Sequence, residues 1–237
     1  MNKILFFSDI DDTLIFSKRK VNFQKELVVA GYNKDKEPFS YFYKDVKKLL
    51  DLLLEAGITF IPNTARNLSS YKRTIFYKNE KIKYAVLNFG GIILKNGKIC
   101  QEWNEIIQHK YKYFDLKSIE KEIKQLFDFG VEIKIIDNFY ISIYNKFFRD
   151  DENICSILEN ILTNYINGKN LKLYLNKNSF AIYPSFLGKE KATKFLIKEL
   201  KPTLILGAGD SNSDLEFMKL ANISILPTNS DLFTSLN

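Results

Sequence analysis

Short runs of apolar residues recur along the chain, and each one ends abruptly at small or polar residues. Four such runs are Ile4–Phe7, Ile58–Ile61, Ala85–Leu87 and Leu204–Leu206. Continuous apolar runs of this length are typical of strands that are buried on both faces, as in parallel sheets. Helical patterns lie between them, over about 46–57 and 191–200. Strands that alternate with helices predict an α/β fold, here a doubly wound, Rossmann-like core with a parallel sheet.

The middle of the chain has a different pattern. It predicts a helix, a hairpin, a second helix and a second hairpin in turn, over about 115–128, 131–144, 151–166 and 171–183. The hairpins are indicated by alternating apolar and polar positions around short turns. We therefore expect an α+β cap domain inserted into a discontinuous core. The expected boundaries are 109–184 for the cap, and 1–108 with 185–237 for the core.

A long connection over residues 14–43 follows the first predicted strand. Connections of this length without secondary structure are uncommon in compact domains unless they are functional. Residues 27–29 are apolar and residues 39–42 are mostly aromatic, and the two segments flank a segment rich in turn-forming residues. We expect these two segments to pair as a hairpin flap.

Chemically active side chains gather where the predicted strands end. Ligands of open α/β sheets bind beyond the carboxyl ends of the strands. The candidates at these positions are Asp9, Asp11, Thr64, Arg66, Asp210 and Asp214, with Lys189 just before a predicted helix.

This set of residues predicts phosphoryl chemistry. Several carboxylates in one place disfavour joint ionisation unless a cation neutralises them. The chain has a single histidine, His109, and two cysteines, so zinc and a disulfide framework are excluded and the expected ligands are oxygen atoms. Oxygen ligands favour Mg²⁺, which is commonly completed by a substrate phosphate. The Thr64 hydroxyl and the Lys189 ammonium suit the remaining phosphoryl oxygens.

Composition narrows the range of partners. The 237 residues include 35 Lys+Arg and 28 Asp+Glu, a formal net charge of +7. The lysines are dispersed and form no basic block, so we expect no nucleic-acid partner. No apolar run is long enough to span a membrane, and the N-terminal run is too short for a signal peptide, so we expect a cytoplasmic protein without a membrane partner. The positive charge would steer a small phosphorylated metabolite, and we expect a monomer or a weak homodimer.

The motif Asp9-Ile10-Asp11-Asp12-Thr13 resembles the DxDxT signature of the haloacid dehalogenase superfamily of phosphohydrolases. Thr64, Lys189 and the Asp210…Asp214 pair stand in the order of that superfamily's other three motifs. The position of the insertion and its helix-hairpin-helix-hairpin order resemble the type II, subtype B cap of Cof-type and sucrose-phosphate phosphatases. The resemblance covers essentially the whole chain.

The resemblance implies a Mg²⁺-dependent phosphatase that forms an aspartyl-phosphate, with a sugar phosphate as the favoured substrate. Asp9 would be the nucleophile, and Asp11 the general acid and then the base. Asp9, the backbone carbonyl of Asp11, and Asp210 would bind Mg²⁺. Asp214 would orient the water shell of the metal or Lys189, while Thr64 and Lys189 would hold the phosphoryl group.

Two positions depart from the family pattern. Ala65 stands where the family usually has glycine, and Ser213 replaces an asparagine in the last motif. Arg66 is interpreted as either a structural or a phosphate-side ion-pair partner. Among neighbouring lysines we prefer Lys189 to Lys191 and Lys194, because its distance from the preceding strand matches the Cof-type pattern.

Other functions remain open at this stage. A phosphotransferase or mutase such as phosphomannomutase would use the same core, and water access to the aspartyl-phosphate separates the two. A Mg²⁺-binding signalling receiver domain also gathers Asp, Thr and Lys, but it has no place for the insertion. For substrate contacts we expect the hairpin turns near Asn138 or Asn178, or the flap at 28–42.

Overall fold

A computed structural model describes residues 3–127, 130–145, 151–176 and 179–235. The chain divides into two compact units. We call Met1–Asn104 with Gly188–Asn237 the core unit, and Glu105–Leu187 the inserted unit. The unit boundaries lie within four residues of those expected at 109 and 184. The assignment of the core unit to catalysis and of the inserted unit to a cap stays a prediction.

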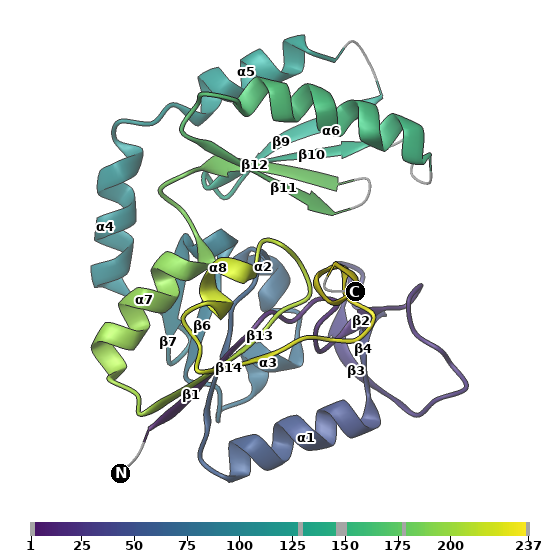
Figure 1. The fold of residues 1–237 in the computed structure, drawn as a ribbon, viewed down its shortest axis with the longest axis vertical. Helices are drawn as coiled ribbons and strands as arrows, with labels where there is room; N and C mark the ends of the chain where they lie inside the picture. Colours follow the sequence, from purple (N-terminus) through teal and green to yellow (C-terminus); the bar gives the residue numbers. More distant parts are fainter. Residues whose placement is uncertain (1–2, 128–129, 146–150, 177–178, 236–237) are drawn as a thin grey trace. The chain divides into compact units, whose positions relative to one another are not determined.

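The core unit contains a parallel sheet in the order β14-β13-β1-β5 (Figure 1). Its strands are β1 (Ile4–Ser8), β5 (Thr59–Pro62), β13 (Leu204–Ala208) and β14 (Ile223–Ile225). Ser8 pairs with Ala208 on one side and with Pro62 on the other. These strands therefore end at one level, and the loops that begin at Asp9, Asn63 and Gly209 leave from the same edge. The expected α/β fold with a parallel core sheet is confirmed.

A second sheet is joined to the loop that follows β5. It consists of β6 (Tyr84–Leu87), β7 (Ile92–Lys95) and β8 (Lys98–Ile99), with the short 3₁₀ helix η1 (Asn88–Gly90) between β6 and β7. An isolated parallel bridge joins Asn63 to Val86, and the backbone N–H of Thr64 donates to the Val86 carbonyl. The end of β6 is therefore held beside the loop that follows β5.

Helices flank the sheets of the core unit. They are α1 (Lys44–Glu55), α2 (Leu68–Tyr71), α3 (Ile75–Lys78), α7 (Lys189–Leu200), α8 (Leu215–Met218) and α9 (Asp231–Thr234), with α4 (Gln101–Tyr111) leading into the inserted unit. The apolar stripe of α1 is buried at Leu50 and Leu54, but Leu49 is 57% exposed beside a cavity of about 470 Å³. The apolar residues that recur at helical spacing in α1 are thus not all buried.

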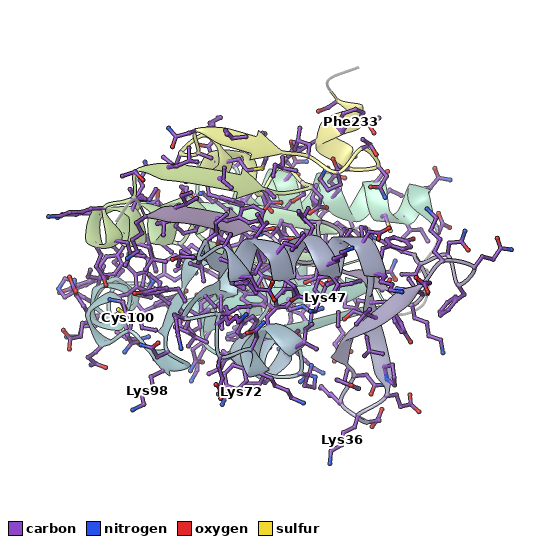
Figure 2. The ribbon with its side chains drawn as sticks, turned by 90° about the horizontal axis from the view of Figure 1, so that it is seen from below. Lys36, Lys47, Lys72, Lys98, Cys100 and Phe233 are labelled. Carbon is purple, nitrogen blue, oxygen red and sulfur yellow. The ribbon has the colours of Figure 1, made fainter. Side chains whose placement is uncertain are left out.

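The expected hairpin flap is present. Strands β3 (Leu27–Tyr32) and β4 (Pro38–Tyr43) pair antiparallel, and β2 (Phe16–Ser17) adds to β4. The Asn33 side chain accepts the backbone N–H groups of Asp35 and Glu37 and closes the turn. Figure 2 shows Lys36 at the tip of this hairpin and Lys98 at β8, both pointing outward from separate elements.

The inserted unit has the expected helix-hairpin-helix-hairpin order. Its elements are α5 (Leu116–Gln125), β9 (Val131–Ile136), β10 (Tyr140–Asn145), α6 (Glu152–Ile166), β11 (Leu171–Asn176) and β12 (Ser179–Pro184). The strands form an antiparallel sheet in the order β11-β12-β10-β9, and α5 and α6 lie on one of its faces (Figure 1). Ile123, Leu162 and Ile182 are fully buried in the core between helices and sheet.

The two hairpin turns of the inserted unit were expected to contact substrate, near Asn138 or Asn178. Asn138 lies in the turn between β9 and β10 with φ near 59°. Asn178, the alternative turn residue expected to contact substrate, lies outside the described residues.

No helix of the described segments is both long and apolar enough to cross a membrane.

Candidate active site

The loop after β1 carries Asp9 and Asp11 on a rigid backbone. The Asp9 N–H donates to the Ala208 carbonyl at 2.9 Å, which ties the start of the loop to β13. The Ile10 carbonyl then accepts the N–H groups of Leu14 and Ile15, and Ile10 itself is fully buried. These hydrogen bonds within the loop hold its backbone in place, so Asp9 and Asp11 keep a defined separation.

Lys189 is the first residue of α7 and lies between two carboxylates. Its Nζ is 2.7 Å from Asp9 Oδ1 and 2.7 Å from Asp214 Oδ1. The three side chains are 4%, 9% and 0% exposed, respectively. Burial by itself would lower the pKa of Lys189, but Asp214 and Asp9 outweigh burial and raise it. The ammonium therefore stays charged and serves both carboxylates.

Two glycines allow close contacts around Lys189 and Asp214, because a side chain at either position would collide with its neighbour. A Cβ on Gly90, whose φ is near 88°, would lie 2.2 Å from the Gly188 carbonyl oxygen, immediately before Lys189. A Cβ on Gly209 would lie 2.4 Å from the Asp214 Cβ. Any larger residue would displace the start of α7 or the Asp214 side chain.

Backbone groups of the last motif position Asp214. Its Oδ2 accepts the N–H groups of Asp210 and Ser211, at 3.3 and 3.2 Å, and the Ser211 hydroxyl at 3.0 Å. Ser213, which departs from the family pattern, has its Oγ 2.9 Å from the Ser211 Oγ. The serine thus takes part in ordering this loop through a hydroxyl pair.

Carboxylate oxygens of Asp9, Asp210 and Asp214 lie within 4.8 Å of one another. Burial, followed by the repulsion of Asp214, raises the pKa of Asp210 to about 7. Burial also raises the pKa of Asp9, against the attraction of Lys189. One ammonium does not neutralise this cluster, and the set of oxygen donors suits a divalent cation such as Mg²⁺. The Asp210 Oδ1 also accepts the Thr13 hydroxyl at 3.1 Å.

Asp11 is held outside this cluster by Arg66. The guanidinium donates from Nε to Asp11 Oδ2 at 2.7 Å and from Nη2 to Asp11 Oδ1 at 2.6 Å. Burial acts to lower the pKa of Arg66, but the Asp11 carboxylate outweighs it and raises that pKa. Sequence reasoning left Arg66 between two roles and did not find this partner, because the residues are 55 positions apart.

Thr64 lies at the same edge and is buried. Its Oγ1 accepts the backbone N–H of Arg66 at 3.1 Å. The neighbouring Asn63 donates from Nδ2 to the Thr193 Oγ1, which in turn donates to the Lys189 carbonyl. Asn63 and Thr193 thus connect the end of β5 to the first turn of α7. Sequence reasoning missed both, since neither belongs to a recognisable motif.

The chain matches one family model over nearly its whole length. Residues 2–233 match the model of sucrose-6F-phosphate phosphohydrolase. No curated protein matches the chain significantly.

Solved structures share the fold at low sequence identity. The sucrose-phosphatase of Synechocystis sp., solved with sucrose and phosphate, is 15% identical, with a TM-score of 0.67 over 100% of this chain and 87% of its own. The C-terminal domain of the C. albicans trehalose-6-phosphate phosphatase is 14% identical, with a TM-score of 0.64 over 92% and 73%. A Thermoplasma acidophilum protein is 13% identical, with a TM-score of 0.59 over 100% and 90%.

Proposed function

Because the chain belongs to the sucrose-6F-phosphate phosphohydrolase family, and is therefore a phosphoric monoester hydrolase of the haloacid dehalogenase type, we propose that it hydrolyses a sugar phosphate with Mg²⁺ and through an aspartyl-phosphate. The observation that carries this proposal is the buried Lys189 between Asp9 and Asp214, inside a carboxylate cluster at the sheet edge.

The residues that would hold the metal are Asp9 and Asp210, together with the backbone carbonyl of Asp11. Asp214 would orient the water shell of the metal or Lys189, because its two oxygens already accept Lys189 and backbone N–H groups. A bound Mg²⁺ would supply positive charge that stabilises the phosphoryl oxygens in the transition state. Burial raises the pKa of Asp9 and of Asp210, so a bound cation would favour the charged forms of both carboxylates.

Asp9 acts as the nucleophile in this proposal. One of its carboxylate oxygens attacks phosphorus, the bond from phosphorus to the ester oxygen breaks, and Asp11 gives a proton to the departing alkoxide. Asp11, now a carboxylate, takes a proton from a water that attacks the aspartyl-phosphate. Inorganic phosphate leaves and the Asp9 carboxylate is restored. Lys189 and Thr64 bind the phosphoryl oxygens.

Substrate choice is assigned to the inserted unit and the flap. The family name indicates a sugar phosphate, and structural neighbours are described as a sucrose-phosphatase and a trehalose-6-phosphate phosphatase. In this proposal the inserted unit acts as a cap, and its Asn138 turn or the β3–β4 hairpin contacts the sugar. Variation in such loops on a fixed scaffold is a common source of specificity.

The test is release of inorganic phosphate from a panel of sucrose 6F-phosphate, trehalose 6-phosphate and glucose 6-phosphate, with Mg²⁺ or with EDTA. We expect turnover with Mg²⁺ and none with EDTA. Asp9→Asn should lower turnover by roughly 10³-fold or more on every ester, since it removes the nucleophile. Asp12→Asn is the matched control, because Asp12 is in the same loop but pairs with Lys20 outside the cluster.

Full activity of Asp9→Asn would refute the nucleophile assignment. Transfer of the phosphoryl group to a sugar hydroxyl, with no phosphate released, would replace the hydrolase by a phosphotransferase or mutase.

A further inference from the structure

Arg66 binds Asp11 in a geometry that fixes the plane of the carboxylate. Each Asp11 oxygen accepts one N–H from the same guanidinium, at 2.6 and 2.7 Å. A paired contact of this kind constrains orientation as well as distance, which a single ammonium does not. The Arg66 side chain is 16% exposed and the Asp11 side chain 43%, so the fork is largely buried while the carboxylate stays accessible.

The backbone of Arg66 is itself anchored on both sides. Its N–H donates to the Thr64 Oγ1 at 3.1 Å, and its carbonyl accepts the Asn88 N–H at 2.9 Å. Thr64 follows β5, and Asn88 begins η1 after β6. The guanidinium is therefore mounted on two strand ends rather than on a free loop, as a positioning group requires.

Asp9 and Asp11 have separate cations. Asp9 is held by Lys189 and Asp11 by Arg66, although the aspartates are two residues apart in one loop. Each carboxylate therefore has a hydrogen-bonded cation of its own. Arg66 is left with no role in the proposed hydrolysis, whereas Lys189 is already used for the phosphoryl oxygens.

We propose that Arg66 is a positioning residue that holds the Asp11 carboxylate where it exchanges a proton with the leaving oxygen and then with water. This inference rests on the proposed function. The contact described here fits Asp11 as a carboxylate, the form left after its proton has passed to the alkoxide. Arg66 acts through Asp11 and does not contact the substrate phosphate.

The leaving group of the substrate tests this role. A poor leaving group such as the alkoxide of glycerol 2-phosphate needs the Asp11 proton, whereas 4-nitrophenolate leaves without it. We expect Arg66→Gln to lower kcat/KM for glycerol 2-phosphate by roughly 10²-fold or more, and for 4-nitrophenyl phosphate by less than about tenfold. Arg66→Lys, which keeps the charge but loses the fork, should fall between wild type and Arg66→Gln.

Lys95→Gln is the matched control. Lys95 lies at the end of β7 remote from η1 and pairs with Glu199 near the end of α7, so both esters should react as with the wild type. Thermal unfolding of each variant shows whether a loss of activity reflects loss of fold.

A double-mutant cycle decides whether Arg66 acts through Asp11. Arg66→Gln in an Asp11→Asn background should cost less than about twofold on either ester, since its partner is already gone. Equal losses on both esters, or full additivity with Asp11→Asn, would overturn the inference and place Arg66 on the substrate phosphate. If Asp11→Asn itself showed no dependence on the leaving group, the proposed role of Asp11 would fail instead.

Discussion

Asp9 and Asp11 belong to one loop, yet the fold places them in contrasting surroundings. Asp9 is 9% exposed, shares the Lys189 ammonium with Asp214, and has further carboxylates close by. Asp11 is 43% exposed and accepts the Arg66 guanidinium through both of its carboxylate oxygens. A buried carboxylate among like charges depends on its cation for stability, whereas a half-open one depends on its cation mainly for orientation.

Because of this difference, we expect the loss of Lys189 and the loss of Arg66 to have different effects on stability and activity. Lysine presents a compact charge that several acceptors can share, and arginine presents a planar fork that suits one carboxylate. Removing Lys189 should therefore disturb the fold and the chemistry together. Removing Arg66 should disturb the chemistry and leave the fold nearly intact.

The largest effect is expected from Lys189→Met. It leaves Asp9 and Asp214 buried without a counter-charge, so the free energy of unfolding of the metal-free protein should fall by about 3–5 kcal/mol. Urea unfolding in EDTA measures this change. The control is Lys194→Met on the exposed side of the same helix, which should shift it by less than about 0.5 kcal/mol. Equal effects of the two variants would contradict the comparison.

An intermediate effect is expected from pH. The pKa of Asp210 is raised to about 7 from an ordinary value of 3.8, so folding favours its protonated form. The stability that this provides is complete below about pH 4 and is lost as the pH rises through 7, amounting to a few kcal/mol. In EDTA, the melting temperature should therefore fall from pH 5 to pH 8.

Magnesium should oppose this fall, because a bound cation replaces the protons on the cluster. Melting curves recorded at several pH values, with and without Mg²⁺, measure the effect. The two melting-temperature profiles should separate above pH 7 and converge toward pH 5. Parallel profiles would show that the cluster does not bind the metal. Asp210→Asn should weaken the pH dependence and leave the part that comes from the raised pKa of Asp9.

The smallest effect is expected from Arg66→Gln on stability. Asp11 becomes partly solvated once the fork is gone, so the free energy of unfolding should decrease by about 1 kcal/mol or less. The same urea titration used for Lys189→Met gives the value. A loss as large as that of Lys189→Met would mean that Arg66 supports the fold, and the contrast between the two cations would be wrong.

Much of the fold follows from local pattern. Strands β1, β5 and β13 are continuous apolar runs, and the helix-hairpin-helix-hairpin order of the inserted unit follows from alternation around turns. The run Leu204–Leu206 in β13 is only half-buried, although its pattern predicts burial on both faces. Exposure was harder to predict. Leu49 recurs at the same helical spacing as Leu50 and Leu54 of α1, which are buried, but its own side chain is 57% exposed.

The sequence by itself determined which chemistry is possible. Its strand ends carry carboxylates, a hydroxyl and cations, and it has too few histidine and cysteine residues for a zinc site made of these ligands. Only the tertiary structure decided which charge meets which. Lys189 reaches Asp9 across 180 positions, and Arg66 reaches Asp11 across 55. These pairs depend on the register of parallel strands that bring distant loops to one edge, and no local pattern in the chain encodes such a meeting.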